Sequence, residues 1–434
     1  MDGSLTPRQE ATMSRIVWRL MPLVMLVYLM AVIDRANVSF AKLQMVKDLG
    51  MSETTYGLAA SLFFIGYLVF EVPSTLALNR FGARAWLARI LVSWGAVTVA
   101  LAFTSSHAMF TVLRFLLGVA EAGAYPGIIF FTTLWFPQAY RARVMAIVTL
   151  GSAFGNMFGS LLSGPLLDLN GVLGFAGWQW IFIATGIPAV IIGVAVFFFL
   201  IDEPARATFL SADEKSWLLG VLEREAAAKA DQGSIWQVLW DGRVLVLSLV
   251  YTLILTALYG VIYWIPTVVR SFGVTGTQNG LLSALPWALA AVLLLIVPSR
   301  IRRHEAALTS MAVLSAIGVA AFLASTMATG NWLRLAGMVI GTPCISLLLP
   351  SFWTLPSRFL SGARAAAGIA AISTVANLGG FASQNLMPMA AEWGGFPAAA
   401  MIVPTICLAV LGLGVIAVKA RTVSATALPV GGSR

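Results

Sequence analysis

The sequence predicts an all-α membrane protein with twelve transmembrane helices in two pseudo-symmetric six-helix bundles. Of its 434 residues, 59% are hydrophobic and only 10% are charged, whereas soluble domains are about 25% charged. Apolar runs long enough to cross a bilayer recur twelve times, and one long polar stretch divides them into six and six. Part of the first half also recurs in the second half.

Crossing the hydrocarbon core takes about 20 consecutive, mostly apolar residues in a helix. Runs of this length predict spans at roughly 17–38, 54–78, 86–104, 108–132, 142–168, 178–200, 244–269, 277–298, 307–328, 331–356, 365–390 and 397–418.

The polar stretch at residues 201–243 predicts a linker that lies outside the membrane. Within it, Ser211 and Glu214 have capping-box spacing, and the apolar residues that follow recur on one helical face. We therefore expect an N-terminal bundle at 1–200, a linker with an amphipathic helix, and a C-terminal bundle with its tail at 244–434.

Positive charge predicts the orientation of the chain. Most of the 27 lysines and arginines fall in the tails, the linker and alternate loops, which places these segments on one side. Only Lys42, Lys47, Arg270 and Arg334 fall on the other side. Because cytoplasmic loops carry the excess of Lys and Arg, we expect both termini to be cytoplasmic.

Two segments of the first half recur in the second. "RARVMAIVTLGSAFGNMFGSLL" aligns with "GARAAAGIAAISTVANLGGFAS", so that Arg143 to Asn156 and Arg364 to Asn377 are both thirteen residues apart. Upstream, "TVLRFLLG" aligns with "NWLRLAGM". Parallel halves of this kind are typical of transporters in which the substrate site lies between the halves.

Few ionisable residues fall within the predicted spans, namely Asp34, Arg35, Glu71, Arg114 and Glu121. A charged side chain at the centre of a membrane helix costs about 2.5–3.5 kcal/mol on insertion scales, so each needs a partner or a water-filled cavity. One interpretation is a set of ion pairs that holds helices together. The other is a functional site.

Helix geometry favours the functional interpretation. Neighbours on a helix point about 100° apart, so Asp34 and Arg35 should face different surroundings. Arg114 and Glu121 are seven residues apart on one face. Arginine suits a carboxylate, and a buried acid can exchange a proton near neutral pH. The four residues therefore predict an anion site beside a proton site, whereas Glu71, near the end of its span, is expected to serve gating or packing.

Five segments together resemble the anion:cation symporter family of the major facilitator superfamily. They are "IDRANVSFA", "FEVPSTLALNRFGARAW", "RFLLGVAEAGAYPGIIFF", "WFPQAYRARVMA" and "GWQWIFIATGIPAV". The similarity covers essentially the whole chain and is strongest in the N-terminal half. Within the family, the chain looks most like bacterial tartrate, phthalate, hydroxyphenylacetate and sugar-acid carriers.

The resemblance implies proton-coupled import of a small mono- or dicarboxylate across the bacterial cytoplasmic membrane. Asp34 and Glu121 would carry protons. The substrate-binding positions that it implies are Arg35, Arg114, Tyr67, Asn156, Tyr259, Trp353 and Asn377. Tyr259 could equally pack between the halves.

The loop "TLALNRFGAR" resembles the superfamily signature G-x-x-x-D-R-x-G-R. Thr75 replaces the first glycine and Asn79 replaces the acid, whereas Arg80, Gly82 and Arg84 remain. The three retained residues are expected to act in gating.

Other classes of function fit the sequence less well. No nucleophile–base set, metal cluster or phosphate loop indicates an enzyme, and the scattered basic residues do not indicate a nucleic-acid partner. We expect a monomer with no metal and no cofactor beyond the coupling proton. The alternative that stays open is a proton-coupled drug or metabolite exporter of the same fold.

Overall fold

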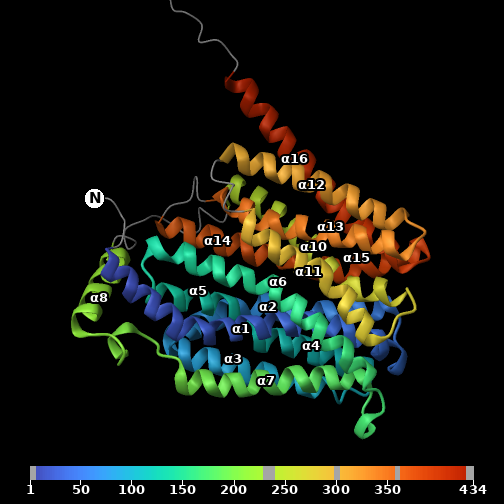
Figure 1. Cartoon of the computed structure of the whole chain (residues 1–434), viewed down its shortest axis with the longest axis horizontal. Helices are drawn as coiled ribbons and strands as arrows, with labels where there is room; N and C mark the ends of the chain where they lie inside the picture. Colours follow the sequence, from blue (N-terminus) through green and yellow to red (C-terminus); the bar gives the residue numbers. More distant parts are fainter. Residues whose placement is uncertain (1–5, 228–239, 298–303, 357–361, 427–434) are drawn as a thin grey trace, which may run out of the picture. The chain divides into compact units, whose positions relative to one another are not determined.

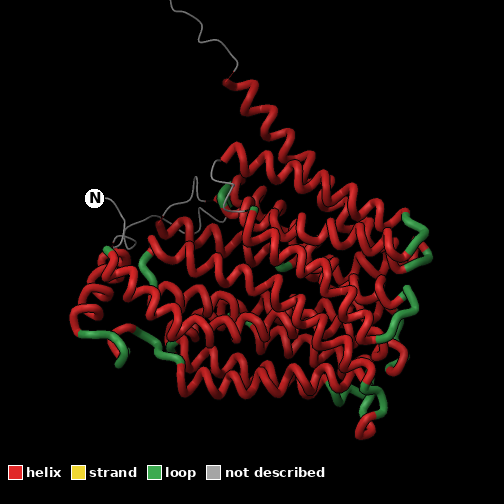
Figure 2. The backbone as a smooth tube through the Cα atoms, in the orientation of Figure 1, coloured by secondary structure: helices red, strands yellow, loops and turns green. Residues whose placement is uncertain are grey.

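The computed structural model describes residues 6–227, 240–297, 304–356 and 362–426. Figures 1 and 2 show that this part of the chain consists of helices joined by short loops. The predicted all-α class is confirmed for the described residues.

In the first half, the described residues form eight α-helices and two short 3₁₀ turns. They are α1 (Pro7–Asp48), α2 (Glu53–Phe81), α3 (Ala83–Leu101), α4 (His107–Glu121), α5 (Ala124–Trp135), α6 (Gln138–Asp168), η1 (Val172–Gly174), α7 (Gly177–Phe199), η2 (Pro204–Arg206) and α8 (Ala212–Ala227).

The second half continues with long apolar helices. They are α10 (Gly242–Arg270), α11 (Gly276–Ile296), α12 (His304–Met327), α13 (Asn331–Trp353), α14 (Gly362–Ala376), α15 (Leu378–Gly394), the 3₁₀ turn η5 (Pro397–Met401) and α16 (Ile402–Thr426).

Eleven helices in the described part are long and apolar enough to cross a membrane. The span predicted at 365–390 is divided into α14 and α15, so neither piece alone is long enough. Asn377 between them keeps right-handed helical dihedrals (φ −61°, ψ −22°), and its N–H still donates to Ser373 O over 3.2 Å. The two pieces therefore continue one path and supply the twelfth predicted span.

By contacts, the chain divides into two compact units. Unit 1 comprises residues 1–234 and 266–284, and unit 2 comprises residues 235–265 and 285–434. The end of α10 and the start of α11 thus pack with the N-terminal helices. The domain boundaries expected at residues 200 and 243 rest on the polar stretch between them and stay a prediction.

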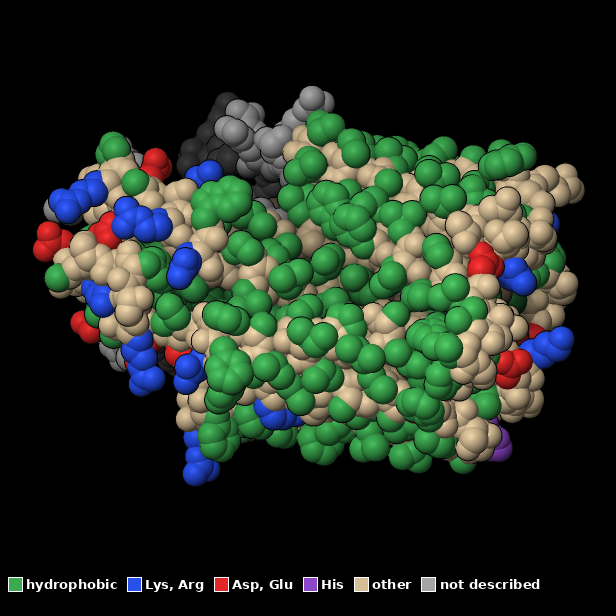
Figure 3. All heavy atoms as spheres, turned by 60° about the horizontal axis from the view of Figure 1, so that its bottom comes forward, with side chains coloured by type: hydrophobic (Ala, Val, Ile, Leu, Met, Phe, Trp, Pro, Cys, Tyr) green, Lys and Arg blue, Asp and Glu red, His purple; other side chains and the backbone are tan. Residues whose placement is uncertain are grey.

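Hydrophobic side chains cover most of the face that includes α3 and α7, and the charged side chains lie mainly towards the two ends (Figure 3). Phe198 of α7, for example, is 70% exposed. An exposed apolar surface of this size suits the hydrocarbon core of a bilayer.

The amphipathic helix expected in the linker is α8. Its predicted capping box is present: Glu214 N–H donates to Ser211 Oγ, and Ser211 N–H donates to Glu214 Oε2 over 2.9 Å. The same carboxylate accepts from Thr12 Oγ1 at 2.9 Å and pairs with Arg15 at 3.3 Å. These contacts hold α8 against the first turns of α1.

Candidate functional site

Asp34 and Arg35 follow each other on α1 but contact different helices, as their helical positions predict. Asp34 is 2% exposed, and its Oδ1 accepts from Thr98 Oγ1 of α3 at 2.9 Å and from Asn37 Nδ2 at 3.1 Å. Asn37 also donates to Thr185 Oγ1 of α7 over 2.9 Å. The acid is therefore enclosed where α1 meets α3 and α7.

Arg35 instead reaches α4 and pairs with Glu121. Its Nη2 and Nε both donate to Glu121 Oε1, over 2.7 and 3.0 Å. The Arg35 side chain is 21% exposed, whereas that of Glu121 is fully buried. Oε2 of Glu121 is buried without a hydrogen-bond partner among the described residues. This free oxygen is where a proton can be added, and protonation would neutralise the carboxylate and reduce the ion pair to hydrogen bonds through Oε1.

Arg114 lies two turns before Glu121 on the same face of α4 and is 1% exposed. Its Nη2 makes one long contact, 3.5 Å, to Ala60 O, and its Nε has no hydrogen-bond partner among the described residues. The guanidinium interacts electrostatically with both Asp34 and Glu121. Because a guanidinium has five N–H donors, Arg114 can receive a planar anion.

Two glycines bring α2 and α4 close enough to build this site. A Cβ at Gly66 of α2 would overlap Phe115 O of α4, and a Cβ at Gly118 would overlap Phe63 O. Small residues at both positions let the two backbones touch. The close approach places the Phe63 ring of α2 against the Arg114 side chain of α4.

The Phe63 ring lies against both arginines, a contact that was not predicted. Its ring centroid lies 4.9 Å from Arg114 Cζ and 5.9 Å from Arg35 Cζ. Tyr67, predicted to contact substrate, lies one turn further, with its ring 5.4 Å from Arg35 Cζ. The four-residue spacing of Phe63 and Tyr67 on one face is the sequence signal that could have identified Phe63.

Asn156 on α6 lies near the level of this cluster. Gly155 packs on Val32, and a Cβ at Gly159 would touch Ala36, so Asn156 is within about one turn of Arg35 along the helix pair. Its amide donates to Ser152 O of its own helix over 2.9 Å. Its predicted contact with substrate stays a prediction.

The three predicted positions of the second half belong to unit 2. Tyr259 is buried and stacks on Tyr263, with ring centroids 6.0 Å apart. Trp353 packs edge-on against Tyr251 of α10 at 5.0 Å. Asn377 occupies the junction of α14 and α15. The structure thus brings Asp34, Arg35, Tyr67, Arg114 and Glu121 together within unit 1. The three positions of the second half lie in unit 2.

The turn between α2 and α3 contains the predicted gating residues. Gly82 has a left-handed φ of 86°, which a residue with a side chain adopts at a cost. Asp202, just after α7, accepts from Arg84 N over 2.6 Å and lies 3.7 Å from Arg84 Nε. An acid from a distant segment therefore serves this turn, where Asn79 replaces the expected one. Arg80 is exposed.

Glu71, the remaining predicted gating residue, is 8% exposed on α2. Its backbone carbonyl accepts from Thr75 Oγ1 over 2.8 Å. Its gating role, like those of the α2–α3 turn, stays a prediction.

Lys42 and Asp168 each make contacts that were not predicted from the sequence. Lys42 is 2% exposed, forms an ion pair with Glu53 and donates to Thr267 Oγ1 over 3.3 Å. Its place two turns from Arg35, on the same face of α1, is the signal that could have identified it.

Asp168 lies at the end of α6 and caps the start of α11. Its carboxylate accepts from the N–H groups of Gly276 and Thr277 over 2.8 and 2.7 Å, and from the Thr277 hydroxyl over 2.7 Å. A Cβ at Gly164 would overlap Gly276 O, so the two helices touch at this end.

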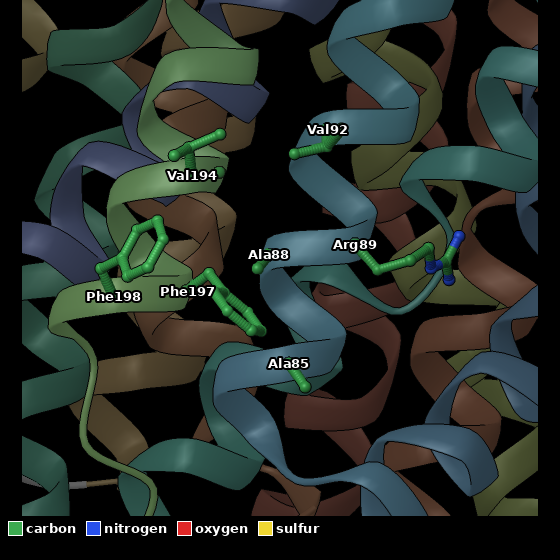
Figure 4. A pocket seen from close by; sticks show the side chains of 8 residues that line it. Ala85, Ala88, Arg89, Val92, Val194, Phe197 and Phe198 are labelled. Atoms are coloured by element: carbon green, nitrogen blue, oxygen red, sulfur yellow. The ribbon is translucent and has the colours of Figure 1, made fainter.

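A surface groove of about 350 Å³ lies between α3 and α7. Figure 4 shows Phe197 and Phe198 of α7 opposite Ala88 of α3, whereas the Arg89 side chain points to the other side of α3. The groove is apolar and shares no residue with the charged cluster, so it suits a lipid chain better than an anion.

The cluster contains two acids and two arginines, so its formal charge is balanced. Of its two arginines, only Arg35 forms a short ion pair in the described structure, with Glu121 at 2.7 Å. Protonation of an acid would leave a net positive site, and deprotonation would restore neutrality. Chemically, the arrangement can bind an anion together with a proton.

Known proteins resemble this chain over most of its length. The model of the Major Facilitator Superfamily matches residues 24–384. A protein of Agrobacterium vitis named "Putative tartrate transporter" is 41% identical over 391 residues, which are 89% of each chain. The "Quinolone resistance transporter" of Acinetobacter baumannii is 39% identical and covers 89% of this chain and 90% of its own length.

Solved structures share the fold at low sequence identity. The D-xylose-proton symporter superposes with a TM-score of 0.71 at 15% identity, covering 92% of this chain and 97% of its own. A bacterial homologue of the lysosomal transporter Spinster, in an inward-facing conformation, gives 0.68 at 16% identity and covers 96% and 98%. The resemblance expected from the sequence is confirmed: this chain is an integral membrane transporter, not an enzyme, and belongs to the Major Facilitator Superfamily.

Proposed function

We propose that this protein is a proton-coupled symporter that imports a small organic anion by alternating access. The observation that carries the proposal is Arg114, a fully buried guanidinium whose Nε has no hydrogen-bond partner among the described residues. A buried donor that stays unsatisfied costs about 1–3 kcal/mol, and more when it is charged. A substrate carboxylate would supply the missing acceptor.

Proton coupling follows from the charge balance of the cluster. While Asp34 and Glu121 are both ionised, they compete with an incoming carboxylate for the two arginines. Protonation of one or both acids removes this competition, so that the anion binds to Arg35 and Arg114. Release of the protons on the other side restores the Arg35–Glu121 pair, now 2.7 Å long, and expels the anion.

The membrane potential makes the coupling necessary. An inward-negative potential opposes entry of an anion by about 2.3 kcal/mol per charge per 100 mV. One proton per negative charge cancels this cost, and a further proton lets the potential assist uptake. We infer that the protein resides in the bacterial cytoplasmic membrane with both termini in the cytoplasm.

The names of the relatives support an organic anion as substrate. Two proteins of Agrobacterium vitis named for tartrate transport are 41% and 40% identical to this chain. Tartrate is a dicarboxylate, so it could engage both arginines of the cluster.

A second candidate is a proton-coupled exporter of drugs, which the quinolone resistance relative favours at 39% identity. Export of a cation would have to place positive charge beside two arginines that are within 6 Å of the same ring. Coulomb repulsion disfavours that arrangement. A zwitterionic or anionic drug would avoid the repulsion.

Purified protein in proteoliposomes distinguishes the two candidates. We expect a pH gradient, acidic outside, to drive accumulation of one or more members of a panel of mono- and dicarboxylates that includes tartrate, and a protonophore to abolish it. Exchange of protons for a quinolone, with no carboxylate accumulated from the panel, would instead establish the exporter.

A further inference from the structure

The helix that carries Glu121 is interrupted directly after that residue. Helix α4 ends at Glu121, α5 begins at Ala124, and Gly123 between them is left-handed with φ 88°. The segment "EAGAYPG" explains the break, because Pro126 has no N–H to donate to Ala122 O four residues earlier. The carbonyl of Ala122, one residue after Glu121, therefore lacks the backbone donor that a continuous helix would supply.

A side chain from another helix supplies the missing donor. The hydroxyl of Ser74 on α2 donates to Ala122 O over 2.6 Å. Ser74 is itself held by Trp86 of α3, whose Nε1–H donates to Ser74 Oγ over 2.9 Å. A Cβ at Gly123 would overlap the same hydroxyl, so only glycine fits there.

The two donors connect the break to the α2–α3 turn. Trp86 stacks on Phe81, with ring centroids 5.5 Å apart and planes 13° apart, and Arg80 lies over the Phe81 ring at 5.5 Å. A continuous set of contacts thus runs from the turn that carries the predicted gating residues, through Trp86 and Ser74, to the peptide group after Glu121.

We propose that Ser74 and Trp86 are positioning residues that fix the interrupted end of α4 and thereby hold the Glu121 carboxyl against Arg35. The inference rests on the proposed function, because it assigns the pair to the proton step. The charged groups that act on Glu121 are Arg35 and Asp34 from α1 and Arg114 from α4. None of these contacts Ser74 or Trp86 in the described structure, so the pair acts through the backbone.

Ser74→Ala removes the hydroxyl, and Trp86→Phe keeps an aromatic ring on Phe81 but removes the N–H. We expect both variants to lose about tenfold in proton-driven accumulation and to shift its pH profile, as loss of one positioning hydrogen bond to a coupled site would do. Counterflow exchange without a gradient should stay within about twofold of the wild type. Ser74→Thr, which keeps a hydroxyl, should recover coupling.

Ser61→Ala is the matched control, because Ser61 is a buried serine of the same helix whose hydroxyl donates to Leu58 O of its own backbone. Size-exclusion profiles and thermal unfolding establish whether each variant is folded. If Ser74→Ala does not fold, Trp86→Phe alone tests the inference. The inference is overturned if Ser74→Ala and Trp86→Phe keep the wild-type pH profile and coupling while Glu121→Gln loses them. If Glu121→Gln itself accumulates substrate normally, the proposed proton role fails first.

Discussion

Units 1 and 2 bury different kinds of polar side chain. The charged side chains buried among the described residues are Asp34, Lys42, Glu71, Arg114 and Glu121, and all belong to unit 1. The buried polar side chains of unit 2 are neutral and include Ser346, Ser383 and Gln384. Because a charged side chain within a membrane is costly, the five buried charges of unit 1 need either ion-pair partners or a function that uses them. On the proposed function, this difference assigns proton and anion binding to unit 1.

Both units also contain an interrupted helix, and the two breaks differ. In unit 1, left-handed Gly123 ends α4 beside Glu121, and Ser74 satisfies the exposed carbonyl. In unit 2, Asn377 keeps helical dihedrals, and Gly379 allows α15 to approach Thr252 and Thr256 of α10. The first break presents an acid, whereas the second presents an amide. On the proposed function, the described buried side chains of unit 2 would offer a substrate hydrogen bonds, because those side chains are neutral.

The largest effect is expected from Arg114→Ala. Removing one partner of a buried charged interaction costs about 2–5 kcal/mol, so substrate binding should weaken by about 30-fold or more, measured by isothermal titration or by uptake in proteoliposomes. Arg334→Ala is the control in unit 2, where Arg334 Nε donates to Ala328 O at a helix end. It should leave binding within about twofold of the wild type. Normal transport by Arg114→Ala would show that this buried charge of unit 1 is not needed for substrate binding.

Glu121→Gln separates binding from coupling. The amide keeps the size of the side chain but carries no exchangeable charge, so exchange of labelled for unlabelled substrate should persist. Accumulation driven by a pH gradient should fall to the level seen without a gradient. Proteoliposomes with internal substrate measure the first quantity, and proteoliposomes without it measure the second.

Asp34→Asn tells which acid of unit 1 carries the proton. If Asp34→Asn uncouples transport and Glu121→Gln does not, the proton role moves to Asp34 and the contrast between the units stands. If both variants accumulate substrate like the wild type, unit 1 does not hold the proton site.

Asn377→Ala tests the neutral contribution of unit 2. Loss of one hydrogen bond costs about 1 kcal/mol, so the affinity for substrate should fall by about fivefold while proton coupling is unchanged. Asn385→Ala is the matched control on α15, because its amide donates to Phe381 O of the same helix over 2.8 Å. A loss of coupling in Asn377→Ala would show that unit 2 takes part in the proton step.

Local features of the sequence predicted much of the fold and part of the site. The capping box of Ser211 and Glu214 needs only its own four residues, and it is present. The 100° between neighbours on a helix predicted that Asp34 and Arg35 face different helices, and they do. Spans of about 20 apolar residues were found for the same reason, since composition alone specifies them.

Features that depend on distant residues were missed. Asp202 serves Arg84 from 118 residues away, and Ser74 reaches Ala122 across 48 residues. Phe63 becomes part of the site only because Gly118 allows α4 to touch α2. No periodicity in the sequence reports such contacts, because they depend on which helices are neighbours.

The smallest effect is expected where unit 1 uses charge at its surface. The pKa of Glu214 is lowered from its ordinary value of 4.5, first because the Ser211 N–H donates to it, and then by the Thr12 hydroxyl and the charge of Arg15. A lowered folded-state pKa means that the contact stabilises α8 fully above about pH 4.5 and is lost as the pH falls through the folded value.

Hydrogen exchange of α8 should therefore be similar at pH 8 and pH 6 after correction for the intrinsic rate, and faster than that reference at pH 4. Glu214→Ala should accelerate it by about fivefold or less at pH 8 and pH 6, because ion pairs near the surface contribute about 1 kcal/mol at most, and by less at pH 4, where the wild type has lost part of the contact. Glu223→Ala, an exposed acid on the same helix, should change neither the rate nor its pH dependence. Substrate binding should be unaffected in both variants, because neither carboxylate belongs to the cluster of Asp34, Arg35, Arg114 and Glu121. An equal loss of binding in Glu214→Ala and Arg114→Ala would show that burial is not what distinguishes the functional charges.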